Sequence, residues 1–218
     1  MTTNQITKRA ALLLTATGPT LFVGLILHPH APKADSMAEV AFTQTGQPNW
    51  WPAHVLLVSS YVVFALFLST IRRLPALSPP ARRVLKLAVP VAWFCVLAML
   101  IHLLLPLGRE SVANSQRGWA LWVKDVVESV DGVWALCVVA VAWTLGRAGI
   151  VGNRLTALLG VAGGFGFALF SFLIPLTGVV VPMQFTRTLV DVVPVFGILM
   201  VAWAVVAGPL LGSRMHPE

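Results

Sequence analysis

Six long apolar runs restrict this chain to a membrane fold more strongly than any other feature of the sequence. Each run is close to or above the roughly 20 residues that a helix needs to cross ~30 Å of hydrocarbon. The runs cover about residues 8–29, 52–71, 84–106, 118–144, 154–176 and 187–211. A mean hydropathy of +0.84 and a charged fraction of 11% agree with an integral membrane protein. We therefore predict an all-α fold in which residues 1–218 form one domain, a polytopic six-transmembrane-helix bundle.

The basic residues are divided unevenly between the two sides that these runs define. Ten of the fifteen Lys and Arg residues fall on the side of the amino terminus: Lys8, Arg9, Arg72, Arg73, Arg82, Arg83, Lys86, Arg147, Arg154 and Arg214. The other side has Lys33, Arg109, Arg117 and Arg187. Cytoplasmic segments of membrane proteins carry such an excess, so both termini are predicted to be cytoplasmic. The net charge of +7 then reflects topology, and we predict no nucleic-acid partner.

The fourth run is unusual because residues 122–134 read "WVKDVVESVDGVW". At ~100° per residue, Lys124, Asp125, Glu128 and Asp131 share one arc of about 120° on a helix. A single central Asp or Lys costs ~2.5–3.5 kcal/mol in lipid on insertion scales, so this arc must face water or the bundle interior. We predict that it lines a polar cavity open to the outside. The structural alternative is an ion pair between Lys124 and Glu128, with Asp125 at a hydrated helix end.

Other ionisable residues are predicted to reach the depth of this arc. His54 opens the second run, and His102 lies about one turn below the outer end of the third. Asp191 lies about one turn into the sixth run, with Arg187 four residues before it. The cavity is therefore expected between the second, third, fourth and sixth runs.

Carboxyl groups beside an apolar pocket indicate acid–base catalysis on a hydrophobic substrate. Carboxyls packed together and partly desolvated cannot all ionise, so at least one should keep its proton near neutral pH and act as a general acid. The candidate catalytic residues are Glu128, Asp125, Asp131 and Asp191. The candidate substrate-binding residues are His54, His102, Trp51, Trp119, Trp122 and Lys124. Tryptophan faces would stabilise a developing cation, although interfacial anchoring is the alternative for these rings.

In size and number of spans the chain is similar to small integral-membrane terpene cyclases, which use buried acidic residues in this way. The resemblance implies protonation of a prenyl or lipid-like double bond, followed by cyclisation or isomerisation. An isomerase or a terpene-cyclase-like lyase that needs no cofactor is the predicted class of enzyme.

Two other classes of function stay open. A carboxylate strip with nearby histidines can relay protons in a small proton-coupled transporter, but the cytoplasmic halves of the runs show almost no polar groups. His54 and His102 come from adjacent antiparallel runs at similar depth, which suits a bis-His haem site. No HExxH, Glu-xx-His or CxxC pattern predicts a metal site.

The stretch from residue 28 to 73, which begins "HPHAPKADSM", resembles one in small multi-span bacterial membrane proteins. Those proteins have "HP" at the end of the first span, a short helical link, and "W…H" at the opening of the second. The resemblance implies a recurring role for His28, Pro29, Trp51 and His54, and a multi-pass location in the bacterial plasma membrane. It implies no activity.

Two smaller features complete the prediction. Residues 35–43 are expected to form a short interfacial helix capped by Asp35 or Ser36. Gly160 and Gly164 form a small-xxx-small pair that lets helices approach closely. We expect this pair to pack within the bundle, and a homo-oligomeric interface is the alternative.

Overall fold

The structure is a computed structural model that describes residues 1–31, 34–113, 119–180 and 183–211, with the side chains of 112–113, 176–180 and 183–191 outside the description. Its elements are α1 (Thr3–Leu27), α2 (Met37–Thr45), α3 (Trp50–Ile71), α4 (Pro79–Leu103), the 3-10 turn η1 (Leu105–Gly108), α5 (Arg109–Ala113), α6 (Trp119–Arg147), α7 (Arg154–Val180) and α8 (Met183–Ala207). No strand occurs in the described ranges. The predicted all-α class is confirmed.

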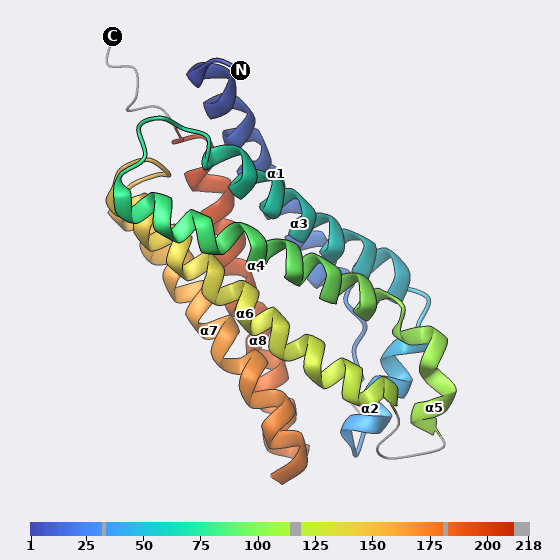
Figure 1. The fold of residues 1–218 in the computed structure, drawn as a ribbon. Helices are drawn as coiled ribbons and strands as arrows, with labels where there is room; N and C mark the ends of the chain where they lie inside the picture. Colours follow the sequence, from blue (N-terminus) through green and yellow to red (C-terminus); the bar gives the residue numbers. More distant parts are fainter. Residues whose placement is uncertain (32–33, 114–118, 181–182, 212–218) are drawn as a thin grey trace.

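The long helices form a closed ring in chain order (Figure 1). Helix α1 packs on α3, α3 on α4, α4 on α6, α6 on α7, α7 on α8, and α8 returns to α1. Large apolar side chains fill the ring, among them Phe64, Phe67, Trp134 and Trp203. Helices α2 and α5 contact each other at the end of the bundle opposite the amino terminus. We call this the α2 end.

Five helices are long and apolar enough to cross a membrane: α1, α3, α4, α6 and the stretch Arg154–Pro175 of α7. Among the residues searched, the apolar part of α8 is Val192–Ala207, which is shorter than a full span. The structure therefore supports a multi-pass membrane protein with five candidate spanning helices. The sixth predicted span corresponds to α8.

Local sequence signals explain where the helices begin and turn. Thr2 caps α1 through a capping box with Gln5. Ser78 caps α4 ahead of two prolines in the first turn, where a missing N–H costs no helical hydrogen bond. Between α6 and α7 the chain turns at Gly149 and Gly152, whose φ angles of 67° and 66° strain any residue with a Cβ.

The predicted short helix in the first link is confirmed as α2. Ser36 caps it by accepting a hydrogen bond from the Glu39 amide. Side-chain amides then tie the link to the end of α1: Gln44 Nε2 donates to the Pro29 carbonyl at 3.0 Å, and Asn49 Nδ2 donates to the Leu27 carbonyl at 2.7 Å. Helix α2 is thereby held against the open end of the ring.

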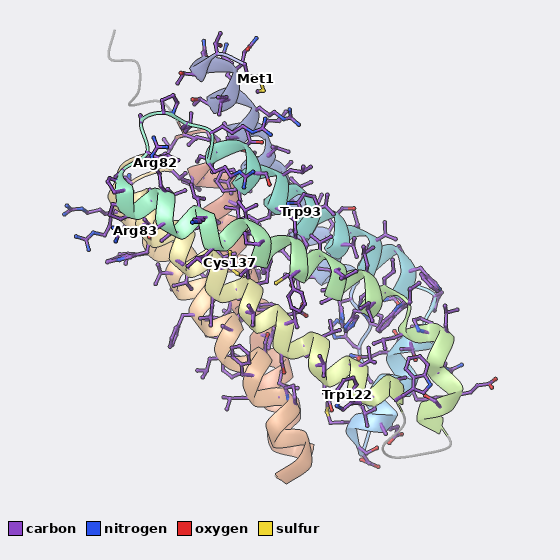
Figure 2. The ribbon with its side chains drawn as sticks, in the orientation of Figure 1. Met1, Arg82, Arg83, Trp93, Trp122 and Cys137 are labelled. Atoms are coloured by element: carbon purple, nitrogen blue, oxygen red, sulfur yellow. The ribbon has the colours of Figure 1, made fainter. Side chains whose placement is uncertain are left out.

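The basic residues collect at the end opposite α2. Figure 2 shows Arg82 and Arg83 toward the end of the bundle where the chain begins, and Trp122 toward the α2 end. Lys8 and Arg9 lie in the first turns of α1, and Arg72 follows the last residue of α3. One end of the molecule is thus strongly cationic, and the described histidines lie toward the other end.

The two glycines of the small-xxx-small pair lie at helix contacts within the chain. A Cβ on Gly160 would lie 2.6 Å from the Ala142 Cβ, and one on Gly164 would lie 2.8 Å from the Ala135 carbonyl oxygen. Both neighbours belong to α6, so packing within the bundle is confirmed as a role of the pair.

Replacing Gly164 with Ala should lower the thermal unfolding temperature in detergent, because backbone atoms of α6 would have to move. Overpacking of this kind costs about 1–3 kcal/mol. The matched control is Gly197→Ala, where the added Cβ meets at close range only the terminal methyl of Leu25, 2.6 Å away. If both variants unfold at the wild-type temperature, the close approach of α6 and α7 is incorrect.

Candidate functional site

A cavity of about 290 Å³ lies inside the ring and reaches the α2 end. Its walls combine two kinds of side chain from seven helices. The apolar residues include Leu21, Leu25, Leu57, Met99, Phe167, Ile174 and Val193. The polar residues include His28, His30, Gln44, His54, Tyr61, His102, Lys124, Glu128, Asp131 and Ser171. Ligand pockets typically measure ~300–1,000 Å³, so this cavity suits a small molecule or one end of a larger one.

Helix α6 brings three charged side chains to one wall of the cavity. Lys124 is only 4% exposed and forms an ion pair with Glu128 one turn further along. Asp131 accepts a hydrogen bond from the Tyr61 hydroxyl of α3 at 3.0 Å. One carboxylate is therefore balanced by an ammonium group, and the other is held by a neutral hydroxyl.

Stacked rings form a second group in the cavity, at its α2 end. The His54 ring stacks on Trp50 with a centroid distance of 3.8 Å and on His102 with a distance of 4.9 Å. His28, at the end of α1, lies 5.0 Å from the His54 ring at a tilted angle. Trp50 Nε1 also donates to the Leu103 carbonyl at 3.2 Å, which links α3 to α4. The histidines of α1, α3 and α4 thus meet in one ring cluster.

Hydrogen bonds to carbonyl groups assign the tautomers of two of these histidines. His54 Nδ1 lies 2.8 Å from the Trp50 carbonyl oxygen, and His28 Nδ1 lies 3.1 Å from that of Pro29. A carbonyl only accepts, so each Nδ1 carries the proton and each neutral ring has a lone pair at Nε2. His54 Nε2 is buried and has no hydrogen-bond partner among the described residues. It is therefore a buried acceptor, on a residue that lines the cavity, and no described donor satisfies it.

An aromatic group packs beyond Tyr61, on the side of the cavity that faces the cationic end. The Tyr61 ring stacks on Trp134 at 4.3 Å, and Phe64 meets Trp134 edge-on at 5.5 Å and Trp203 edge-on at 6.4 Å. Phe64, Trp134 and Trp203 are each at most 1% exposed. We call these three residues the aromatic floor. Asp131 and Tyr61 therefore lie at the deepest polar level of the cavity.

Five of the residues predicted for the site do line this cavity: His54, His102, Lys124, Glu128 and Asp131. Three of the four charged residues in the arc predicted for α6 accordingly face the bundle interior. Asp125 does not line the cavity and is only partly buried. It lies on the edge of the arc, on the side away from Asp131.

The three tryptophans predicted to bind substrate are not brought to the cavity. Trp51 is 42% exposed, Trp119 57% and Trp122 67%. On α6 the two rings lie about 180° and 120° from Glu128 at ~100° per residue, which directs them out of the ring. Exposed tryptophans near the end of a spanning helix fit the alternative of interfacial anchoring.

Asp191 lies in α8, but its side chain is outside the described residues. The same holds for Arg187, four residues earlier. Both assignments stay predictions.

Sequence reasoning missed several residues that the fold brings to the cavity. Tyr61 is the single tyrosine of the chain, and its place seven residues, or about two turns, after His54 puts both on one face of α3. That spacing was a usable signal. Gln44 reaches the cavity through the folding of α2 against α1, which no local pattern predicts. Ser171 comes from the middle of α7, in a run that otherwise looks purely apolar.

Metal or haem ligation finds little geometric basis in the part of the chain that the structure describes. No group of three or more His, Cys, Asp or Glu side chains is placed to hold a metal ion there. The His54 and His102 rings stack face to face at an interplanar angle of 16°. The two axial histidines of a haem instead approach the iron from opposite faces of the macrocycle.

No family model, no curated protein and no solved structure matches this chain.

Proposed function

We propose that the protein is an intramembrane enzyme that performs acid–base chemistry on a hydrophobic substrate. The observation that carries this proposal is the pairing of Asp131 and Glu128, one helical turn apart, in a cavity whose remaining walls are largely apolar. Asp131 is oriented by Tyr61, and Glu128 by Lys124. Two carboxyl groups in different local environments can divide the roles of acid and base between them.

In the proposed reaction, Asp131 donates its proton to a carbon of a substrate double bond. A C–H bond forms and the positive charge develops on the neighbouring carbon. Glu128 then removes a proton from another carbon, the new double bond forms, and the substrate leaves isomerised or cyclised. The substrate gains one proton and loses one, and a proton passes from Glu128 back to Asp131 through water to restore the enzyme, so no oxidant, reductant or cofactor is consumed. The Tyr61 ring, whose hydroxyl group donates to Asp131, lines the cavity and can stabilise the cation.

The small size of the cavity restricts how a substrate binds. A volume of about 290 Å³ accepts the reacting end of a prenyl or lipid-like molecule, and the rest of a long chain would extend through the mouth of the cavity. We therefore infer a substrate that enters with its reactive end first.

The topology we propose has six spans, with α8 as the sixth, and both termini in the cytoplasm of a bacterial cell. Arg82, Arg83 and the other basic residues at the end opposite α2 support this orientation. The cavity would then open toward the outer leaflet. Transport is not favoured, because the aromatic floor lies where a pathway to the cytoplasm would have to continue.

A test in deuterated water follows from this chemistry. The purified protein in nanodiscs, incubated with a bacterial lipid extract in D₂O, should place one deuterium on a carbon of one lipophilic compound per turnover. Mass spectrometry would detect the label, and empty nanodiscs give the background. If no compound gains carbon-bound deuterium with the wild-type protein, or if the label persists in the double variant Asp131→Asn and Glu128→Gln, the enzyme proposal is wrong.

A further inference from the structure

Three buried side-chain atoms of the cavity have no hydrogen-bond partner within the described parts of the chain: His54 Nε2, Glu128 Oε2 and His102 Nδ1. All three residues line the cavity. His54 Nε2, on a residue that is 1% exposed, and Glu128 Oε2 are acceptors. An unmet buried acceptor costs about 1–3 kcal/mol, so these atoms favour a ligand that brings its own N–H or O–H groups.

The charge balance of the cavity favours a cationic donor over a neutral one. Lys124 is the only Lys or Arg among the lining residues that the structure describes, and Glu128 already pairs with it. Asp131 adds no cation to this balance, because its hydrogen bond comes from the neutral Tyr61 hydroxyl. His28 and His54 contribute lone pairs, because their protons are directed to backbone carbonyls. All these groups attract a positively charged N–H donor.

We propose that the cavity binds a lipophilic amine, with the ammonium group between His54 and Glu128 and the apolar part against Leu57, Met99 and Ile174. An ammonium group offers three N–H donors and a positive charge. An alcohol offers one donor and no charge, and a carboxylate offers no donor and is repelled by the acidic wall. The inference rests on the proposed function in one respect: it names the substrate class of that same cavity.

The experiment is equilibrium binding of three probes with the same chain length, namely radiolabelled octylamine, octanol and octanoate. The full-length protein is used in nanodiscs at pH 7, and binding to empty nanodiscs is subtracted. We expect saturable binding of octylamine at least ten-fold tighter than that of octanol, and no saturable binding of octanoate. Equal or tighter binding of octanol would overturn the proposal, as would uptake of Zn²⁺ by the histidines with no binding of the amine.

Variants locate the site. His54→Phe keeps a ring for stacking on Trp50 but removes the acceptor, and should weaken octylamine binding at least five-fold. Glu128→Gln should weaken it as strongly, because Lys124 would then repel the ammonium. Asp125→Asn, on the same helix but away from the cavity, should leave binding unchanged. Thermal unfolding identifies any variant that does not fold, and either of the first two that folds is sufficient for the decision. Equal weakening in all three variants contradicts the site.

Failure of this inference can be separated from failure of the enzyme proposal. Binding is measured without turnover. Tight octylamine binding with no deuterium transfer would therefore contradict only the enzyme proposal. Conversely, the protein could transfer deuterium to a compound without nitrogen and bind no amine. That result would contradict only the proposal that the substrate is an amine.

Discussion

Replacing Asp131 with Asn should reduce deuterium transfer by about 10²–10⁴-fold, the usual contribution of a positioned general acid. The amide has nearly the same shape as the carboxyl group, and it can still accept a hydrogen bond from Tyr61. It cannot supply a proton to a carbon. The measurement is the initial rate of label incorporation at saturating substrate, with binding of the substrate measured separately.

The comparison that makes this result informative is Asp125→Asn. Asp125 has the same chemistry and lies on the same helix, but it is outside the cavity. Its loss should change the rate less than about two-fold, within the scatter expected of a residue that makes no contact with the reacting atoms. A drop as large as that of Asp131→Asn would show that the arc acts as a whole, and that the assignment of the acid to one residue is incorrect.

Replacing Lys124 with Met should lower the stability of the protein, because Glu128 loses its ion-pair partner. Removing one partner of a buried ion pair typically costs ~3–5 kcal/mol, because the other charge is left without compensation. Glu128 has a side chain that is 24% exposed, so water relieves part of this penalty and we expect roughly 2 kcal/mol. The thermal unfolding temperature in a fixed detergent gives the measurement.

The double variant Lys124→Met and Glu128→Gln tests the reason for that loss. With no charge left unpaired, it should recover most of the wild-type unfolding temperature. If the double variant is as unstable as Lys124→Met alone, packing of the Lys124 side chain, and not charge compensation, stabilises this part of α6.

The sequence was sufficient to predict the fold class and one wall of the site, and the reasons are physical. Charges are so costly in lipid that the position of Lys124, Glu128 and Asp131 on one arc leaves only an inward orientation. Hydropathy alone similarly identifies α1, α3, α4, α6 and α7 as candidate spans. Both inferences use patterns along the sequence, and breaking either pattern would cost a large free energy in lipid.

The opposite wall could not be predicted because it depends on how separate helices meet. His28 follows the end of α1 in the sequence, yet the approach of α1 to α3 places its ring 5.0 Å from His54. Proximity in sequence predicts that Trp119 and Trp122 bind substrate together with Glu128. Their angular position on α6 separates them from Glu128 and directs them out of the ring.

The aromatic floor has a kinetic consequence. In the proposed enzyme, the aromatic floor leaves the α2 end as the route into the cavity, so the product must leave by the route that the next substrate needs. We therefore expect product to act as a competitive inhibitor, and turnover to be indifferent to the membrane voltage, since no charge passes from one compartment to the other. Mixed inhibition, or a rate that follows an imposed potential in sealed vesicles, would mean that the floor opens during the cycle.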